Sequence, residues 1–225
     1  THSSSMKFKS LSNCCLFTLF CLILFVSYSN SFQASWQLDD KPNILNNHRL
    51  QLTELSLKQF WQASHASPGS GGFYRPVACI SLALNWFFGR DNVTGYHIVN
   101  FLIHCSTAWL LYLTIKTLFS TPRLLGRYSN GQIAFISATA ALLWALNPIN
   151  TQAVTYIVQR MTSLAAMFSL LSILCYLKAR LCEDTTRRTT FLVCAAITYL
   201  LALLSKENAI IIIVTLPVFE PLFFQ

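Results

Sequence analysis

Long apolar runs separated by short polar segments dominate the sequence, and they predict a bundle of membrane-spanning helices. Crossing the hydrocarbon core of a bilayer takes about 20 mostly apolar residues. A further apolar run, Val77–Phe88, is too short to span, and we expect an interfacial helix or a partial span there. The predicted fold class is an all-α polytopic integral membrane bundle with about six spans. These spans are expected at Leu11–Tyr28, His97–Phe119, Ile133–Leu146, Met161–Leu177, Phe191–Leu204 and Ala209–Phe224.

The predicted spans divide the chain into four parts. We expect a cytoplasmic tail at 1–10, a signal-anchor span at 11–31, an outer loop at 32–96 and a bundle of five further spans at 97–225. A cleaved signal peptide is the alternative at 11–31, but this run is long for one and more spans follow it. The outer loop contains a loop signal at Ser67–Gly72.

Composition supports lipid as the solvent. Hydrophobic residues make up 54% of the 225 positions and charged residues only 11%, whereas a soluble domain is about 25% charged. The net charge of +8 comes from basic residues that lie mostly in short loops. Such placement orients membrane proteins, so we expect the lipid bilayer, and no nucleic acid, as a partner.

The basic residues predict which loops share a side of the membrane. With a cytoplasmic N-terminus, the opposite short loops keep only Arg160 and Lys206. We therefore expect the 32–96 loop, the Arg160 segment and Lys206–Glu207 to share the outer face, in the periplasm or a lumen. The residues expected on the cytoplasmic side are Lys7, Lys9, Lys116, Arg123, Arg127, Lys178, Arg180, Arg187 and Arg188.

Two polar groups at the expected outer face are candidates for chemistry. Asp39 and Asp40 are adjacent just beyond the first span, where a low dielectric raises carboxylate basicity and suits a general base or a cation ligand. The alternative is a solvated pair that ends a helix. Lys206 and Glu207 interrupt two apolar runs, where ionisable residues are costly unless they are paired or functional.

Two further stripes of polar residues recur at helical spacing. Gln152 and Gln159 belong to a stripe that predicts one amphipathic helix whose polar face is available to a cavity or to water. An interfacial helix that only leads into the next span is the alternative. His97 and His104 lie on one face of the second span. Such groups normally hydrogen-bond between helices, and a direct role is considered only for His97, nearest the outer face.

Five stretches recur in one order along the chain. They are Leu38–Asp40 with Asn43–Ile44, Tyr74–Pro76 with Ser81–Asn85, Gly95–Asn100 with His104, Asn147–Arg160, and Leu203–Glu207. Together they resemble the N-terminal membrane half of the tetratricopeptide-repeat membrane proteins related to the protein O-mannosyltransferases, and their sequences most resemble the bacterial branch. The resemblance covers nearly all of the chain from Phe32 onward.

The resemblance implies a GT-C-type glycosyltransferase that moves a sugar from a polyprenyl-phosphate carrier to a protein or glycan acceptor on the outer face. Its first outer loop carries an acidic motif, here Asp39–Asp40. Family members usually have His where this chain has Asn147 and often Glu at Gln152, which puts a proton-handling role of that segment in doubt. The family also has about twice as many spans followed by helical repeats, whereas this sequence stops directly after an apolar run. The resemblance therefore implies a fragment or an interrupted reading frame, and we expect this chain alone to be inactive.

The predicted reaction is an inverting transfer in which Asp39 or Asp40 is the base. Arg75, Arg160 and Lys206 are the expected ligands of the lipid phosphate, with Arg160 the foremost. The expected substrate cavity contains His97, Gln152, Gln159 and Glu207. No metal or other cofactor is expected to be obligatory beyond the polyprenyl-phosphate sugar, which is the donor substrate.

A non-enzymatic membrane scaffold or a transporter-like bundle is the alternative function. Motifs for nucleotide binding, zinc hydrolysis and the serine nucleophile elbow are missing from the sequence. The expected location is the bacterial inner membrane, or the endoplasmic reticulum membrane if the protein is eukaryotic, with a cytoplasmic N-terminus.

Overall fold

The computed structural model describes residues 2–67 and 72–225, and the regular elements within these ranges are all helical. The expected loop at Ser67–Gly72 therefore lies mostly outside the described residues. Its neighbours α2 (Leu57–Ser64) and α3 (Pro76–Gly89) are short. The longer helices are α1 (His2–Tyr28), α4 (Val93–Leu118), α5 (Asn130–Ala145), α7 (Arg160–Arg180), α8 (Thr185–Ser205) and α9 (Ile212–Phe219), and α6 (Thr151–Thr155) is a single turn.

The predicted fold class is confirmed. In the described part of the chain, five helical segments are long and apolar enough to cross a membrane. A sixth span results if α5 and the Pro148–Thr155 segment, which meet at a bend of 55°, count as one. α1 begins at His2, so residues 2–10 continue the first span as a helix.

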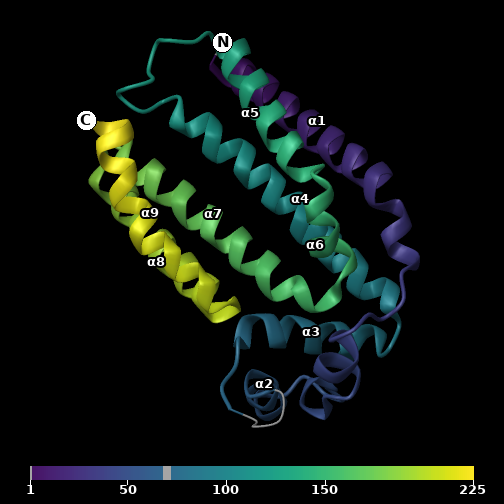
Figure 1. Ribbon diagram of the computed structural model, residues 1–225. Coiled ribbons are helices and arrows are strands. Elements are labelled where there is room, and N and C mark those ends of the chain that lie inside the picture. Colours follow the sequence, from purple (N-terminus) through teal and green to yellow (C-terminus); the bar gives the residue numbers. More distant parts are fainter. Residues whose placement is uncertain (1, 68–71) are drawn as a thin grey trace.

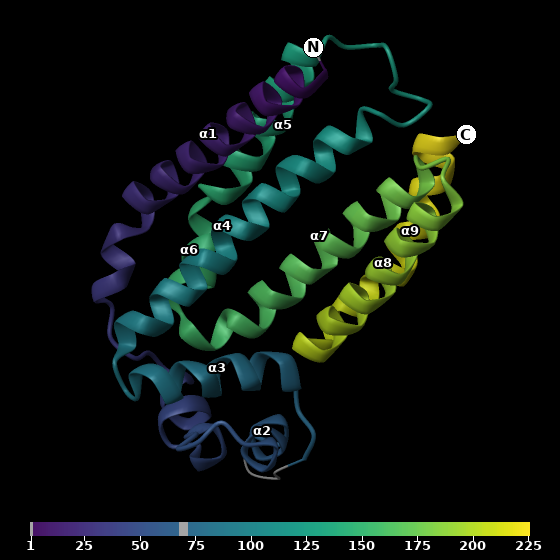
Figure 2. The same cartoon turned by 180° about the vertical axis from the view of Figure 1, so that it is seen from behind.

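The long helices run alternately up and down, and both chain ends lie at the same end of the bundle (Figures 1 and 2). α2 and α3 lie at the opposite end, and α3 runs crosswise over the ends of α4 and α7 (Figure 1). At that end the chain also passes from α6 into α7 and from α8 into α9. The three segments expected on the outer face thus share one end of the bundle, which we call the loop end. The side of the membrane that it faces stays a prediction.

Small and aromatic side chains pack the spans against one another. Ala108 of α4 and Ala141 and Ala145 of α5 are buried in one cluster with Phe20 and Tyr112. Small residues let helix backbones approach closely, which is how helices associate in lipid. A second cluster joins the outer loop to α3, α4 and α7, so the loop end is packed onto the bundle.

The expected continuous amphipathic helix through Gln152 and Gln159 is wrong. The helix ends at Thr155, Tyr156 adopts an extended conformation (φ −89°, ψ 105°), and α7 begins at Arg160. The reason is a long-range contact: the Asp40 carboxylate accepts the backbone N–H of Val158 at 2.8 Å. A side chain that takes a backbone N–H in this way satisfies a free donor of the helix start, so a new helix begins there.

Candidate functional site

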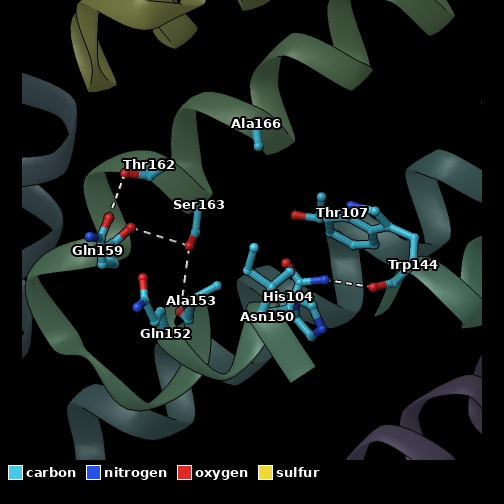
Figure 3. A pocket seen from close by; sticks show the side chains of 11 residues that line it. His104, Thr107, Trp144, Asn150, Gln152, Ala153, Gln159, Thr162, Ser163 and Ala166 are labelled. Carbon is cyan, nitrogen blue, oxygen red and sulfur yellow. Dashed lines mark hydrogen bonds between the residues drawn. The ribbon is translucent and has the colours of Figure 1, made fainter. Parts of the chain in front are cut away.

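A cavity of about 180 Å³ lies between α4, α5, α6 and α7, and Figure 3 shows the side chains that line it. Of the four residues expected in a substrate cavity, Gln152 and Gln159 line it, whereas His97 and Glu207 do not. Gln152 and Gln159 therefore line the same cavity, although the helix between them is broken at Tyr156. The full lining is His104, Thr107, Trp144, Ile149, Asn150, Gln152, Ala153, Gln159, Thr162, Ser163 and Ala166.

The cavity wall is mostly apolar, and its polar groups carry no formal charge. Amide and hydroxyl groups of the lining bond to one another and to the backbone: Thr162 Oγ1 donates to Gln159 Oε1 at 2.7 Å, and Asn150 Nδ2 to the Trp144 carbonyl at 2.6 Å (Figure 3). Ser163 Oγ donates to the Gln159 carbonyl at 3.2 Å. An apolar wall with a few neutral donors and acceptors suits a neutral ligand better than an ion.

A lysine stands beside this wall. Lys206 Nζ donates to Thr162 Oγ1 at 2.7 Å, so Thr162 both lines the cavity and contacts a cation. Lys206 is half-buried, and burial together with the nearby positive charge of Arg75 lowers its pKa below the usual 10.5. Glu207 opposes this shift in pKa.

Arg75 lies next to the lysine and is paired with Glu207. Its Nε and Nη2 donate to the two oxygens of Glu207 at 3.0 and 2.5 Å, a bidentate ion pair. The side chain of Glu207 is 68% exposed and that of Arg75 only 19%. Hydrogen bonding to Glu207 raises the pKa of Arg75. Arg75 also has φ +41°, although a residue before proline is normally extended; such strain concentrates where a side chain has to be aimed.

The two aspartates have different surroundings. Asp39 is exposed, and its backbone N–H donates to the Tyr156 hydroxyl at 3.2 Å. Asp40 is fully buried and accepts the backbone N–H groups of Gln37 and Val158. Burial raises the pKa of Asp40, and the backbone N–H groups oppose that rise. Asp39 is therefore accessible to a substrate, whereas Asp40 holds the chain break in place.

Arg160 lies deeper than expected. It is fully buried, and its guanidinium donates to Asn100 Oδ1, Asn85 Oδ1 and the carbonyls of Ser81 and Tyr96, at distances between 2.5 and 3.1 Å. These acceptors come from α3 and α4, so the side chain fastens the start of α7 to both helices. The expected role of Arg160 as a phosphate ligand required it to be exposed at the edge of a span, and Arg160 is not exposed there.

His97 is also fully buried and joins two backbone segments. Its Nε2 lies 3.0 Å from the Ala34 carbonyl and its Nδ1 3.4 Å from the Val154 carbonyl. His97 thus forms hydrogen bonds between segments of the bundle, which is the usual role of polar side chains within membrane spans. The sequence analysis did not identify Thr162 as a cavity residue. It placed His104 on the same face of the second span as His97 but did not assign it to the cavity. Within residues 2–67 and 72–225, no group of three or more His, Cys, Asp or Glu side chains is arranged to hold a metal ion.

Comparison with known proteins identifies relatives over most of this chain. Protein O-mannosyl-transferase Tmtc1 of Drosophila melanogaster is 32% identical over 192 residues, which are 84% of this chain and 20% of that protein. Protein O-mannosyl-transferase TMTC4 of Homo sapiens is 30% identical over 207 residues, 88% of this chain and 28% of that protein. Drosophila Tmtc2 is 29% identical over 226 aligned positions, 97% of this chain and 22% of that protein.

This chain thus spans between a fifth and just over a quarter of the length of these curated relatives. No protein-family model matches the sequence, and no solved structure matches it significantly. The three relatives are animal proteins, and the affiliation with a bacterial branch stays a prediction.

Proposed function

We propose that this chain, a homologue of the protein O-mannosyl-transferases, is a membrane part of a glycosyltransferase that moves a sugar from a polyprenyl-phosphate carrier to a protein or glycan acceptor. One observation carries the proposal. A cavity lined by neutral groups contacts Lys206 through Thr162, and the positive charge of Arg75 lies close to that lysine. A sugar phosphate has the same two parts, a neutral ring and an anionic group.

Arg75 and Lys206 hold the phosphate in this proposal. Arginine binds phosphate and carboxylate oxygens through the same planar fork, and lysine adds a point charge. The two-bond contact of Arg75 with Glu207 has the geometry that a phosphate would use. Glu207 is largely exposed, so its side chain has room to swing away when the phosphate arrives.

Asp39 is the proposed base. It takes the proton of the acceptor hydroxyl, the oxygen attacks the anomeric carbon, and the bond from that carbon to the phosphate oxygen breaks. The bonding electrons stay on the polyprenyl phosphate, whose charge Arg75 and Lys206 stabilise. Asp40 does not take part in proton transfer, because both of its oxygens already accept backbone N–H groups.

The loop end faces the outer side in this proposal, because the cytoplasmic side collects most of the short-loop basic residues. The animal origin of the relatives favours the lumen of the endoplasmic reticulum over the periplasm. A membrane scaffold remains the alternative. It is favoured by Arg160, a buried cation whose four hydrogen bonds all serve helix packing.

A full-length protein that contains this chain provides the test. Purified in detergent, it should transfer a labelled sugar from a short-chain polyprenyl phosphate to a peptide, and Arg75→Ala should weaken binding of the bare polyprenyl phosphate. Arg188→Ala, at an exposed position near the start of α8, is the matched control and should bind normally. Wild-type protein that neither binds the lipid phosphate nor transfers sugar would favour the scaffold.

A further inference from the structure

His104 is held in one tautomer. Its Nε2 lies 2.9 Å from the Ala145 carbonyl, which can only accept, so Nε2 carries the proton. That carbonyl is free because α5 ends at Ala145 and the N–H of Ile149 bonds to Asn147 Oδ1 instead. The Tyr28 hydroxyl donates to the same carbonyl at 2.7 Å.

The other ring nitrogen is left as an acceptor. With Nε2 protonated, Nδ1 of the neutral imidazole carries a lone pair, and no residue in the described ranges donates to it. His104 is 2% exposed and lines the cavity. Its ring is packed against Tyr28 at 5.2 Å and Trp144 at 5.3 Å between ring centroids, which restricts its rotation.

The cavity has the size and chemistry for one sugar ring. A cavity of about 180 Å³ has room for several waters, which is the size class of a single pyranose. Gln152, Gln159 and Ser163 offer neutral hydrogen-bonding groups, and Trp144 offers an apolar face. An occupant that donates a hydroxyl proton to this acceptor gains a hydrogen bond that an apolar occupant cannot make.

We propose that a neutral monosaccharide unit binds in this cavity and that Nδ1 of His104 accepts a hydrogen bond from one of its hydroxyl groups. This proposal rests on the proposed function, because the monosaccharide is the sugar attached to the polyprenyl-phosphate donor. Thr162 connects the two, since it lines the cavity and accepts a hydrogen bond from Lys206. His104 is thus a specificity-determining residue that selects a sugar by the position of one hydroxyl.

Two variants separate the acceptor role from packing. His104→Gln places an amide N–H near the position of Nε2, keeps the bond to Ala145, and removes the Nδ1 lone pair. Tyr28→Phe removes the other hydrogen bond to Ala145 and leaves the cavity wall unchanged. Both variants are compared for folded yield, so that loss of structure is separated from loss of binding.

The experiment places a single reporter cysteine at Ala166, which lines the cavity, in a cysteine-free full-length background. A neutral thiol reagent labels it, and a methyl hexoside is the competing ligand. One hexoside epimer should protect the cysteine from labelling in the parent protein. In His104→Gln the same protection should need about 10-fold more of that hexoside, the loss expected for one buried hydrogen bond. Tyr28→Phe should need the same concentration as the parent.

Absence of protection in the parent, or equal protection in His104→Gln, overturns the inference. Binding of bare polyprenyl phosphate, measured in the same protein, separates this result from the proposed function. Phosphate binding without sugar protection contradicts only the role of His104. Sugar protection without phosphate binding supports that role and contradicts only the donor.

Discussion

The carboxylate of Asp40 accepts the backbone N–H of Val158, a residue 118 positions later, at 2.8 Å. This bond joins the first outer loop to the point where the chain turns from α6 into α7. It gives Asp40 a structural role and leaves its neighbour Asp39 exposed. The two carboxylates should therefore respond differently to the same substitution.

Asp39→Asn in the full-length protein should reduce sugar transfer about 100- to 10,000-fold, as expected for the loss of a general base, with an unchanged melting temperature. Asp40→Asn turns an amide toward backbone N–H donors and should destabilise the fold by about 1–3 kcal/mol. Transfer assays and thermal unfolding in detergent measure both effects. Normal transfer by Asp39→Asn would remove Asp39 as the base.

Arg160→Lys should reduce the amount of folded protein. Lysine is a point charge without the planar fork of arginine, so some of the four acceptors around the guanidinium would lose their donor, at about 1–3 kcal/mol each. Arg188→Lys, an exposed control, should have no effect. Normal folding with weakened lipid-phosphate binding would instead restore Arg160 as a phosphate ligand.

Glu207→Gln should strengthen the binding of polyprenyl phosphate, because it removes the carboxylate that competes for Arg75. We expect an increase of about 2- to 5-fold, in line with the loss of a competing, largely exposed ion pair. Glu183→Gln, an exposed position between α7 and α8, is the matched control. Weaker binding in Glu207→Gln would mean that the ion pair positions Arg75 and does not block it.

The pKa of Lys206 should move in opposite directions in two variants. Arg75→Gln removes a positive neighbour and should raise this pKa, whereas Glu207→Gln removes a negative neighbour and should lower it. Because binding of an anion needs the protonated amine, lipid-phosphate affinity should fall as pH rises through the lowered pKa. The rate of amine labelling as a function of pH measures the shift, and identical profiles in all three proteins would contradict it.

Membrane sidedness can be tested with single cysteines at Leu55, just before α2, and at Ser129, directly before α5; both residues are exposed. Figure 1 shows α2 and the start of α5 at opposite ends of the bundle. An impermeant reagent added to the outer or luminal face should label the Leu55 position and not the Ser129 position. The reverse pattern would place the cavity and its neighbouring cations on the cytoplasmic side.

The sequence alone determined the class of fold and the end of the bundle to which each loop belongs. An apolar run long enough to span is a local property, since the bilayer obliges each segment to satisfy its own backbone hydrogen bonds. Alternating spans then assign Asp39, Gln159 and Lys206 to one end without any knowledge of packing. Helical spacing also grouped Gln152 with Gln159, and both residues reach the same cavity although the helix between them is broken.

Only the tertiary structure decided which of these polar groups are available. Asp39 and Asp40 are neighbours in sequence, yet a partner 118 positions away buries one of them. Arg160 looked like a residue at the edge of a span until acceptors from α3 and α4, 60 or more positions earlier, enclosed it. The free nitrogen of His104 likewise depends on a carbonyl 41 positions later. Burial and hydrogen-bond partners come from segments distant in sequence, and no local pattern encodes which of them will meet.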